Sequence, residues 1–332
     1  KAYEIQGSLC LGTSLNKLGY DHVFYVKLAS GSVFSHLVNN GDKEDTRRTV
    51  NNILLDGPSL RAYRHFPNVG KRKSWAAADA SKRGIELAII STYEDEIYES
   101  VQNENNWGFE SSFLDNSKLE FGKELNNWVI QNILFKVLFP AEFHGQSAVE
   151  AAIKLSKEFN KNINKVEKIN IYTHEPAVRI ISNKEVLKNA SDRDHSLEYM
   201  VAAALLYGEL KYEMYEDSFE GFENINNLRK KIFVTEEPKF TKDYYEFSKR
   251  HISNSIEIEY IDNSISEKIT IENPIGHPSR RHEAVPLLKD KFLRNVKSVF
   301  EAEKASNIWD KIINLKKDDD LNIFFNILNE DE

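Results

Sequence analysis

The position of strand-like sequence along the chain is the feature that most constrains its fold. Residues 1–123 and 275–332 carry apolar side chains mainly at helical spacing, whereas residues 124–274 also contain runs typical of strands. This order of elements predicts an α+β fold. We expect a mostly helical large domain built from both chain ends, 1–123 plus 275–332, and an inserted smaller α+β domain, 124–274.

Within these domains the apolar pattern predicts individual elements. Helices are expected near the N-terminus, in residues 1–16, and over residues 22–40, 44–55, 74–94, 142–159, 192–210 and 283–315, and the tail beyond is expected to stay helical and acidic. Ser74 is the expected N-cap of the 74–94 helix. Strands are expected within residues 128–140 and 166–178, and a hairpin over 254–274 that turns at Asp262 and Asn263.

Composition narrows the class of protein. The 332 residues carry a net charge of -8 and have no long uncharged apolar run, which argues against nucleic-acid partners, anionic membranes and a transmembrane helix. The single cysteine, Cys10, excludes an internal disulfide and a cysteine-ligated metal or iron–sulfur cofactor, and favours a reducing compartment. The chain lacks an initiator Met, so we interpret it as a fragment or a processed product.

A long basic loop separates two of the predicted helices. Residues 56–73, DGPSLRAYRHFPNVGKRK, have no apolar period and contain six Arg, Lys or His side chains. Long irregular loops in compact domains are often functional. A solvated surface loop explains the composition equally well.

Lys136 and His144 interrupt an apolar pattern in the stretch NILFKVLFPAEFHGQ. Lysine is almost never buried unpaired, so the alternative to a functional Lys136 is an edge position turned to water. His144 lies where a helix should begin, and free N–H groups there favour an anion. The alternative for His144 is a local hydrogen bond at a helix start.

Other cations also fall at predicted helix starts. Lys73 precedes an Ala-rich helix, and His22 precedes an apolar one. The charged group at 192–195 is typical of helix capping by mutual pairing more often than of chemistry, and a domain-interface network explains the group at 277–282 equally well. Together, the cationic helix starts of an acidic chain suggest a pocket for a polyanionic small molecule.

Several long stretches resemble the 2-methylcitrate dehydratase family (MmgE/PrpD). They include GYDHV, DGPSLRAYRHFPNVGKRKSWAAADA, NILFKVLFPAEFHGQSAVEAA, DRDHSLEYMVAAALLYGEL and PIGHPSRR, in order along the chain. The resemblance implies a helical large domain, an inserted α+β domain and an active site between them. It also implies a homodimer, no metal or other cofactor, and dehydration of the small tricarboxylate 2-methylcitrate in propionate catabolism.

The resemblance assigns roles to particular residues. His22, Lys73, Lys136 and His144 match catalytic positions of the family, and Arg64, His65 and Tyr199 match substrate-binding positions. Lysines would hold carboxylates and developing negative charge, and the imidazoles would transfer protons because they titrate near neutrality. We expect a mitochondrial matrix location in a eukaryote or a cytoplasmic one in a bacterium.

The chain also departs from the family pattern. The family's N-terminal helical segment is absent from these residues, and Ala62 and Ala78 stand where Thr and Gly are usual. The alternatives are therefore a citrate or cis-aconitate hydro-lyase, a cis-aconitate decarboxylase-like enzyme, and a non-catalytic truncated paralogue.

Overall fold

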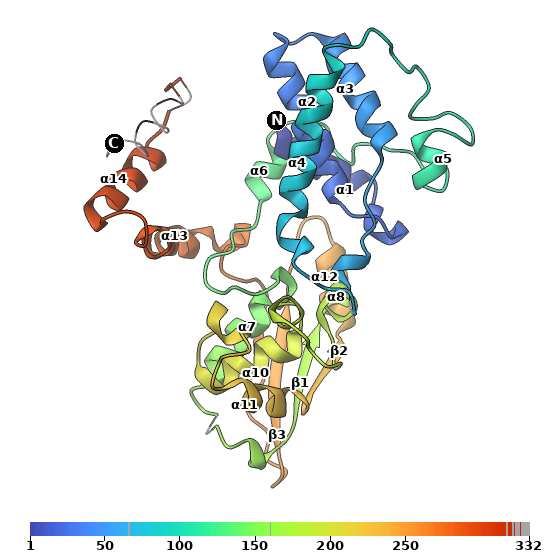
Figure 1. The fold of residues 1–332 in the computed structure, drawn as a ribbon. Helices are drawn as coiled ribbons and strands as arrows, with labels where there is room; N and C mark the ends of the chain where they lie inside the picture. Colours follow the sequence, from blue (N-terminus) through green and yellow to red (C-terminus); the bar gives the residue numbers. More distant parts are fainter. Residues whose placement is uncertain (66, 160, 317, 321, 323–325, 327–332) are drawn as a thin grey trace. The chain divides into compact units, whose positions relative to one another are not determined.

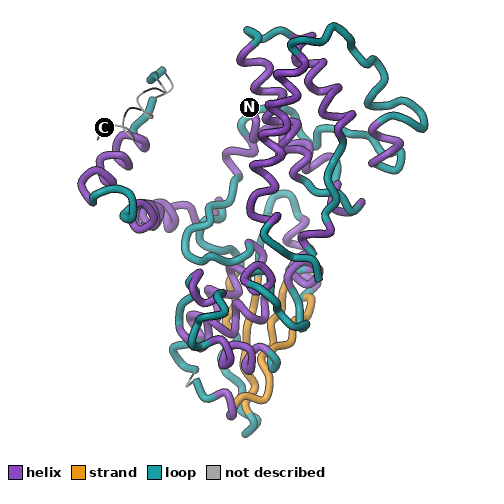
Figure 2. The backbone as a smooth tube through the Cα atoms, viewed as in Figure 1, coloured by secondary structure: helices purple, strands orange, loops and turns teal. Residues whose placement is uncertain are grey.

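The chain divides into two compact units. The computed structural model describes residues 1–65, 67–159, 161–316, 318–320, 322 and 326. Unit 1 comprises residues 1–133 and 186–193, and unit 2 comprises residues 134–185 and 194–332. Figure 2 shows helices in both units, and the strands, drawn in orange, belong to unit 2. The predicted α+β class is confirmed.

Unit 1 is built around three long helices. Its helices are α1 (Ala2–Gly12), α2 (Val23–Val38), α3 (Lys43–Asp56), α4 (Arg72–Ser91), α5 (Phe109–Phe113), α6 (Trp128–Asn132) and α9 (Ala190–Arg193), with 3-10 turns at Leu15–Leu18 and Ala62–Arg64. Helix α2 packs against α1, α3 and α4, and buries Phe24 and Leu28 against Ile53 and Leu87. The helices predicted over residues 1–16, 22–40, 44–55 and 74–94 are confirmed as α1 to α4.

Two glycines set the closeness of α2 and α4. A Cβ atom on Gly84 would lie 2.4 Å from the carbonyl oxygen of Lys27, and one on Gly31 would lie 2.8 Å from the carbonyl oxygen of Gly84. No real Cβ contact is that short, so the backbones approach only because both residues lack a side chain. Ser30 and Ser81 share a hydrogen bond of 3.1 Å beside this crossing.

The predicted N-cap of α4 is wrong. The helix begins at Arg72, with Lys71 as its N-cap, and the Ser74 hydroxyl donates back to the carbonyl oxygen of Lys71 at 2.7 Å. Ser74 therefore lies inside the first turn. The sequence pattern placed the N-cap three residues late because Arg72 and Lys73 were assigned to the loop.

Unit 2 contains a four-stranded mixed sheet in the order β2-β1-β3-β4. Its elements are η3 (Phe143–Gly145), α7 (Gln146–Leu155), η4 (Ile163–Lys165), β1 (Val166–Thr173), α8 (Glu175–Ile181), α10 (Leu197–Tyr207), η5 (Tyr212–Tyr215), α11 (Phe222–Arg229), β2 (Ile232–Glu236), α12 (Pro238–Tyr245), β3 (Asn254–Tyr260), β4 (Ile269–Ile271), η6 (Pro278–Arg280), α13 (Arg281–Val296) and α14 (Ala302–Ile313). Figure 1 shows α7, α10 and α11 on one face of the sheet.

The sheet topology brings two loops together. Strands β1 and β2 are parallel, and α8 and α12 follow them directly. Because parallel strands end at the same edge of a sheet, the starts of α8 and α12 are neighbours. The backbone N–H of Glu237 donates to the carbonyl oxygen of Thr173 at 2.7 Å and ties these two strand ends together.

Helix α7 lies within the helix predicted over residues 142–159, and it is buried on nearly all sides. Every residue from Gln146 to Ala152 is buried, and so are Leu155 and Phe159. The helix contacts α10, β3 and β4. Helix α7 therefore belongs to the core of unit 2.

The predicted hairpin and one predicted strand are confirmed. Strand β1 lies within residues 166–178, and β3 pairs antiparallel with β4. Asn263 has a φ of 65°, and the carboxylate of Asp262 accepts from the backbone N–H of Ser264 at 3.0 Å. The chain thus turns at the predicted Asp262 and Asn263.

The strand predicted within residues 128–140 is wrong. Residues 128–132 form α6, and the following chain is extended without belonging to a sheet. Phe135 donates one backbone hydrogen bond, to Gly276 at 3.0 Å, and Val137 is buried. A partly buried segment outside the sheet shows the same run of apolar residues as a strand, so the pattern alone did not separate them.

The helix predicted over residues 192–210 is present as α10, which begins at Leu197 and is capped by Ser196.

The C-terminal region also has the predicted helices. Helices α13 and α14 lie within residues 283–315, apart from the first two residues of α13. The prediction of a helical acidic tail falls mostly outside the described residues. Contacts group residues 194–332 with unit 2, and assignment of 275–332 to the large domain stays a prediction.

Among the described helices, none has the length and apolar character needed to span a bilayer.

Candidate active site

In unit 1, His22 lies beside a buried carboxylate. Asp21 is fully buried, and its Oδ1 lies 3.1 Å from Nδ1 of His22, the N-cap residue of α2. Arg64 donates from Nε to Oδ2 of Asp21 at 2.7 Å, and the Tyr63 hydroxyl donates to the same oxygen. Burial raises the pKa of Asp21, but hydrogen bonds from His22, Tyr63 and Arg64 outweigh it and hold that pKa well below its usual range.

The basic loop folds back over the start of α2. Nη1 of Arg61 lies 3.3 Å from Nδ1 of His22, and Nε of Arg61 donates to Nε2 of His65 at 3.1 Å. The loop is fixed by backbone bonds as well, from Asp21 to Ser59 at 2.8 Å and from Arg61 to Gly19 at 2.9 Å. Three of the predicted residues, His22, Arg64 and His65, therefore share one network.

Lys73 lies in the first turn of α4. Its side chain is half-buried and donates to the carbonyl oxygen of Ser191 in α9 at 3.4 Å. The segment before it is also tied to this region, because the side-chain amide of Asn189 donates to the carbonyl oxygen of Val69 at 3.2 Å. Lys73 is thus held at the junction of α4 and α9 within unit 1.

In unit 2, Lys136 is exposed on an extended segment. Its ammonium group lies 5.4 Å from the centre of the Phe143 ring, the residue that precedes His144. Its backbone carbonyl accepts a hydrogen bond from Lys291 of α13. Burial lowers the pKa of Lys291, and the neighbouring charges of Lys136 and Arg294 lower it further. Lys136 and Arg294 therefore both lie close enough to Lys291 for their positive charges to act on it.

His144 lies in the 3-10 turn before α7 and is bonded to Glu142. Nδ1 of His144 lies 2.8 Å from Oε1 of Glu142, and its backbone N–H donates to Oε2 at 2.7 Å. Both side chains are largely buried. The local hydrogen bond of the alternative interpretation is present, and the same carboxylate also orients the imidazole ring.

Tyr199 is fully buried in α10. Its hydroxyl donates to the carbonyl oxygen of Met214 at 2.6 Å, and its ring stacks on Tyr215 with centroids 6.0 Å apart. These contacts give Tyr199 a packing role. Its predicted contact with substrate stays a prediction.

The charged clusters singled out in the sequence are mutually paired. Asp192 accepts from the backbone N–H of Lys188 at 2.8 Å, and His195 lies 2.7 Å from Asp194. Arg280 donates to Glu150 of α7 at 2.9 Å and also to Glu283, and this pairing raises its pKa. Local pairing is therefore present in both clusters, and their other roles stay predictions.

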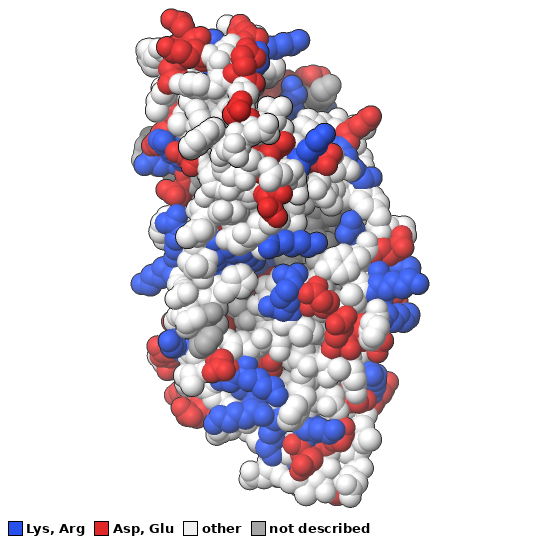
Figure 3. All heavy atoms as spheres, turned by 90° about the vertical axis from the view of Figure 1, so that its right-hand side faces the viewer, with Lys and Arg blue, Asp and Glu red and all other residues white. Residues whose placement is uncertain are grey.

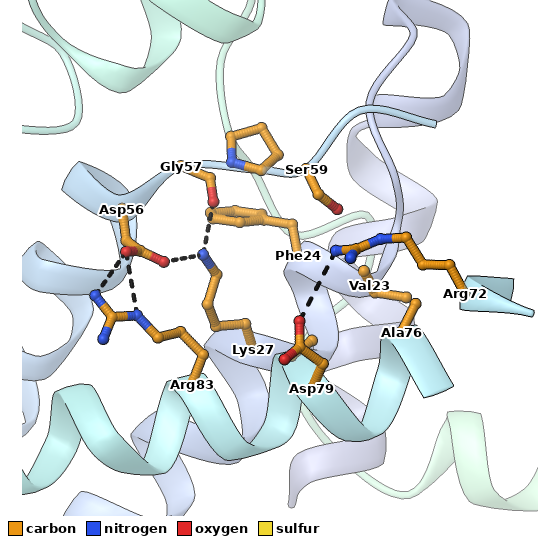
Figure 4. Close-up of a pocket in the computed structure, with 12 residues that line it drawn as sticks. Val23, Phe24, Lys27, Asp56, Gly57, Ser59, Arg72, Ala76, Asp79 and Arg83 are labelled. Carbon is orange, nitrogen blue, oxygen red and sulfur yellow. Dashed lines mark hydrogen bonds and ion pairs between the residues drawn. The ribbon is translucent and has the colours of Figure 1, made fainter. Parts of the chain in front are cut away.

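A separate cavity of about 210 Å³ lies in unit 1 between α2, α3 and α4 (Figure 4). The buried Lys27 donates to Asp56 and to the carbonyl oxygen of Gly57, both at 2.6 Å. Arg83 donates to Asp56 at 2.9 Å, and Arg72 lies 3.8 Å from Asp79. The cations that line this cavity are already matched with carboxylates, and none of the seven predicted site residues lines it.

The positions of the predicted residues divide between the two units. His22, Arg64, His65 and Lys73 belong to unit 1, and Lys136, His144 and Tyr199 belong to unit 2. Their convergence on one cleft stays a prediction. Sequence reasoning missed Asp21 and Glu142, although a carboxylate one or two residues before a histidine is a usable signal.

The surface and the acidic groups show two further features. Figure 3 shows Lys and Arg side chains interspersed with Asp and Glu over the face drawn. Within the described residues, no group of three or more His, Cys, Asp or Glu side chains has a metal-binding arrangement.

The fold is thus that of an α+β protein with a helical unit and a mixed-sheet unit, and each unit has a histidine beside a carboxylate. The MmgE/PrpD N-terminal domain matches residues 1–122, and the MmgE/PrpD C-terminal domain matches residues 139–317. The chain belongs to the MmgE/PrpD family.

Several curated relatives are 2-methylcitrate dehydratases. The enzyme of Escherichia coli K12 is 41% identical over 311 residues, which are 93% of this chain and 64% of that protein. The enzyme of Salmonella typhimurium LT2 is 40% identical over 93% of this chain and 65% of its own length. A mitochondrial 2-methylcitrate dehydratase of Yarrowia lipolytica is 38% identical over 93% of this chain and 60% of its own length. The chain thus spans just under two thirds of the length of these relatives.

Proposed function

We propose that this chain belongs to a 2-methylcitrate dehydratase, a hydro-lyase that needs no cofactor and converts 2-methylcitrate to 2-methyl-cis-aconitate in the methylcitrate cycle of propionate catabolism. The observation that carries the proposal is the identity of 38% to 41% with 2-methylcitrate dehydratases over 93% of the chain. The two family-model matches include every predicted site residue except Lys136, which lies between them.

The proposed dehydration removes one proton and one hydroxide from neighbouring carbon atoms. A base takes the proton from a carbon next to a carboxylate, and the C–H electron pair becomes the second bond of the new C=C. The neighbouring C–O bond breaks, and the departing hydroxide takes a proton from an acid and leaves as water. The two needs are proton transfer near neutral pH and stabilisation of negative charge.

The local geometry supports these roles. His22 lies beside Asp21, and His144 lies beside Glu142, so each imidazole has a carboxylate partner suited to orienting it. Lys73 and Lys136 supply positive charge for substrate carboxylates, assisted by Arg64 and His65. The base and the acid are not assigned separately to the two histidines.

The proposal extends to partners and location. The substrate is a small tricarboxylate, and the whole protein is a homodimer. Its location is the mitochondrial matrix in a eukaryote or the cytoplasm in a bacterium. The name of the Yarrowia lipolytica relative supports the first of these locations.

Turnover of defined substrates tests the function. The full-length protein is incubated separately with 2-methylcitrate, citrate and cis-aconitate, while the absorbance of the conjugated product and the release of CO2 are followed. We expect dehydration of 2-methylcitrate to be the fastest reaction. Faster reaction of citrate or cis-aconitate would favour the alternative enzymes, and no turnover by folded protein would leave the non-catalytic paralogue.

A further inference from the structure

Glu142 is placed to control the protonation pattern of the His144 ring. Its two carboxylate oxygens lie 2.8 Å and 3.0 Å from Nδ1 of His144. Burial raises the pKa of Glu142, but the charge and hydrogen bonds of His144, with a smaller effect of His195, lower it to about 2. Glu142 is therefore ionised at every pH at which such an enzyme works.

An ionised carboxylate has only acceptor atoms, which fixes the position of one proton. Because Glu142 cannot donate, Nδ1 of His144 must carry the hydrogen of their shared bond. In the neutral ring Nε2 is then the nitrogen with the free lone pair. Any proton that His144 accepts or returns moves at Nε2.

The opposite side of the ring faces α12. Nε2 of His144 lies 3.3 Å from the hydroxyl oxygen of Tyr244, which can donate to that lone pair. The Tyr244 ring stacks on His174 with centroids 4.8 Å apart and an interplanar angle of 11°. The His174 ring lies 5.2 Å from His144. His174 follows β1, and Tyr244 lies in α12, which follows β2, so the parallel pairing of these strands brings both side chains beside His144.

His174 completes the cluster as a neutral group. It is fully buried, and burial together with the charge of His144 lowers its pKa to about 4. Its Nδ1 lies 3.4 Å from the carbonyl oxygen of Ser253, and within the described residues its buried Nε2 has no hydrogen-bond partner. The charge of His195, which is paired with Asp194, also acts on Glu142. Glu175 acts on His174, and Arg179 and Arg250 act on Tyr244.

We propose that Glu142 is a positioning residue, which holds His144 in the tautomer whose Nε2 exchanges protons with the substrate, and that Tyr244 occupies Nε2 while no substrate is bound. The catalytic part of this inference rests on the proposed function. The tautomer itself does not, because it is set by contacts within unit 2.

The tautomer can be observed without substrate. Full-length protein labelled with 15N-histidine is examined by NMR, with His144→Gln identifying the resonances of that ring. We expect the wild-type ring to keep its proton on Nδ1 from about pH 6 to 8. A neutral ring protonated on Nε2 in the wild-type protein would overturn the proposal, and this measurement needs no Glu142 variant.

The variant Glu142→Gln removes the charge of the carboxylate but keeps its hydrogen bond with the backbone N–H of His144. The amide oxygen of the variant still accepts from the backbone N–H of His144, but its NH2 group can face Nδ1 and reverse the tautomer. We expect kcat to fall by about 10²-fold or more, with KM changed little, on the scale of a lost acid–base contribution.

A matched control is Glu237→Gln. Glu237 is the N-cap of α12, and its side chain accepts from the backbone N–H of Lys239 at 3.3 Å, in the same spacing as Glu142 and His144. We expect this variant to keep the wild-type kcat and pH profile. An unchanged kcat and pH profile in folded Glu142→Gln would overturn the positioning role. Absence of 2-methylcitrate turnover by the wild-type protein would instead overturn the proposed function and leave the tautomer result valid.

Discussion

Nε of Arg64 donates to the fully buried carboxylate of Asp21 at 2.7 Å, which fixes the basic loop to the start of α2. The Arg64 side chain is itself mostly buried, with 15% of its surface exposed. Removing one partner of such a pair leaves the other charge largely dehydrated. The bond therefore contributes to stability as well as to the position of His22.

We predict that Asp21→Asn lowers the free energy of unfolding by about 2–4 kcal/mol at pH 7, measured by urea denaturation. Because the pKa of Asp21 is lowered by folding, its contribution is complete above the unfolded pKa of about 4 and disappears as the pH falls toward the folded pKa. The difference between wild type and variant should therefore shrink below about pH 4.

The control for this prediction is Glu99→Gln. Glu99 pairs with Arg47, but 74% of the Glu99 side chain is exposed, so water replaces the lost bond. We expect a change within about 0.5 kcal/mol at pH 7. A loss as large as that of Asp21→Asn would show that burial does not determine the cost.

Lys27 and Asp56, which line the cavity of unit 1, should differ in their contribution to stability. Asp56 accepts from both Lys27 and Arg83, whereas the Lys27 ammonium relies on Asp56 and a backbone carbonyl (Figure 4). We predict that Asp56→Asn costs about 2–3 kcal/mol, because it leaves the buried Lys27 without a counter-charge. Lys27→Met should cost less, since Arg83 still pairs with Asp56. Thermal unfolding of both variants measures the difference, and equal losses would contradict it.

Gly84→Ala should destabilise unit 1 although alanine is the better helix former. The new methyl group would lie 2.4 Å from the carbonyl oxygen of Lys27, so α2 and α4 must separate. We expect a net loss of about 1–3 kcal/mol, typical of overpacking, against a helix-propensity gain of about 1 kcal/mol for a solvent-facing site. Lys82→Ala, on the exposed side of α4, is the control and should change stability by less than about 0.5 kcal/mol.

The sequence predicted correctly the helices that have a clear apolar periodicity of their own. It did not predict the structure of segments whose conformation depends on contacts with residues far along the chain. Helices α2, α3 and α7 have apolar residues at helical spacing in the chain itself, so they were predictable. The extended segment around Phe135 was mistaken for a strand because its single backbone bond to Gly276 depends on residues far along the chain. Strand patterns also do not reveal which side chains meet at the ends of β1 and β2.

In the candidate site, too, residues close together in the sequence could be predicted, whereas contacts between distant residues could not. Asp21 and Glu142 are near neighbours of the predicted histidines in sequence and could have been proposed from that spacing. Tyr244 is 100 residues from His144 along the chain, and the parallel pairing of β1 with β2 brings it there. A single sequence contains no direct record of that pairing.

Lys136→Ala should lower turnover of 2-methylcitrate by at least about 10²-fold, the scale of losing one preorganised charge contact. The side chain is exposed, and its backbone carbonyl, which accepts from Lys291, is kept in the variant. We therefore expect an unchanged unfolding midpoint. Initial rates and thermal unfolding of full-length wild type and variant provide the two measurements.

Lys184→Ala is the matched control for that prediction. Lys184 is also an exposed lysine of unit 2 whose ammonium group lies over an aromatic ring, 3.9 Å from the centre of Phe233. A general effect of losing one positive charge, or one cation–π contact, would appear in both variants. A specific effect on turnover in Lys136→Ala alone identifies a charge that the substrate contacts, whereas an unchanged rate in that folded variant would return Lys136 to the role of an ordinary surface lysine.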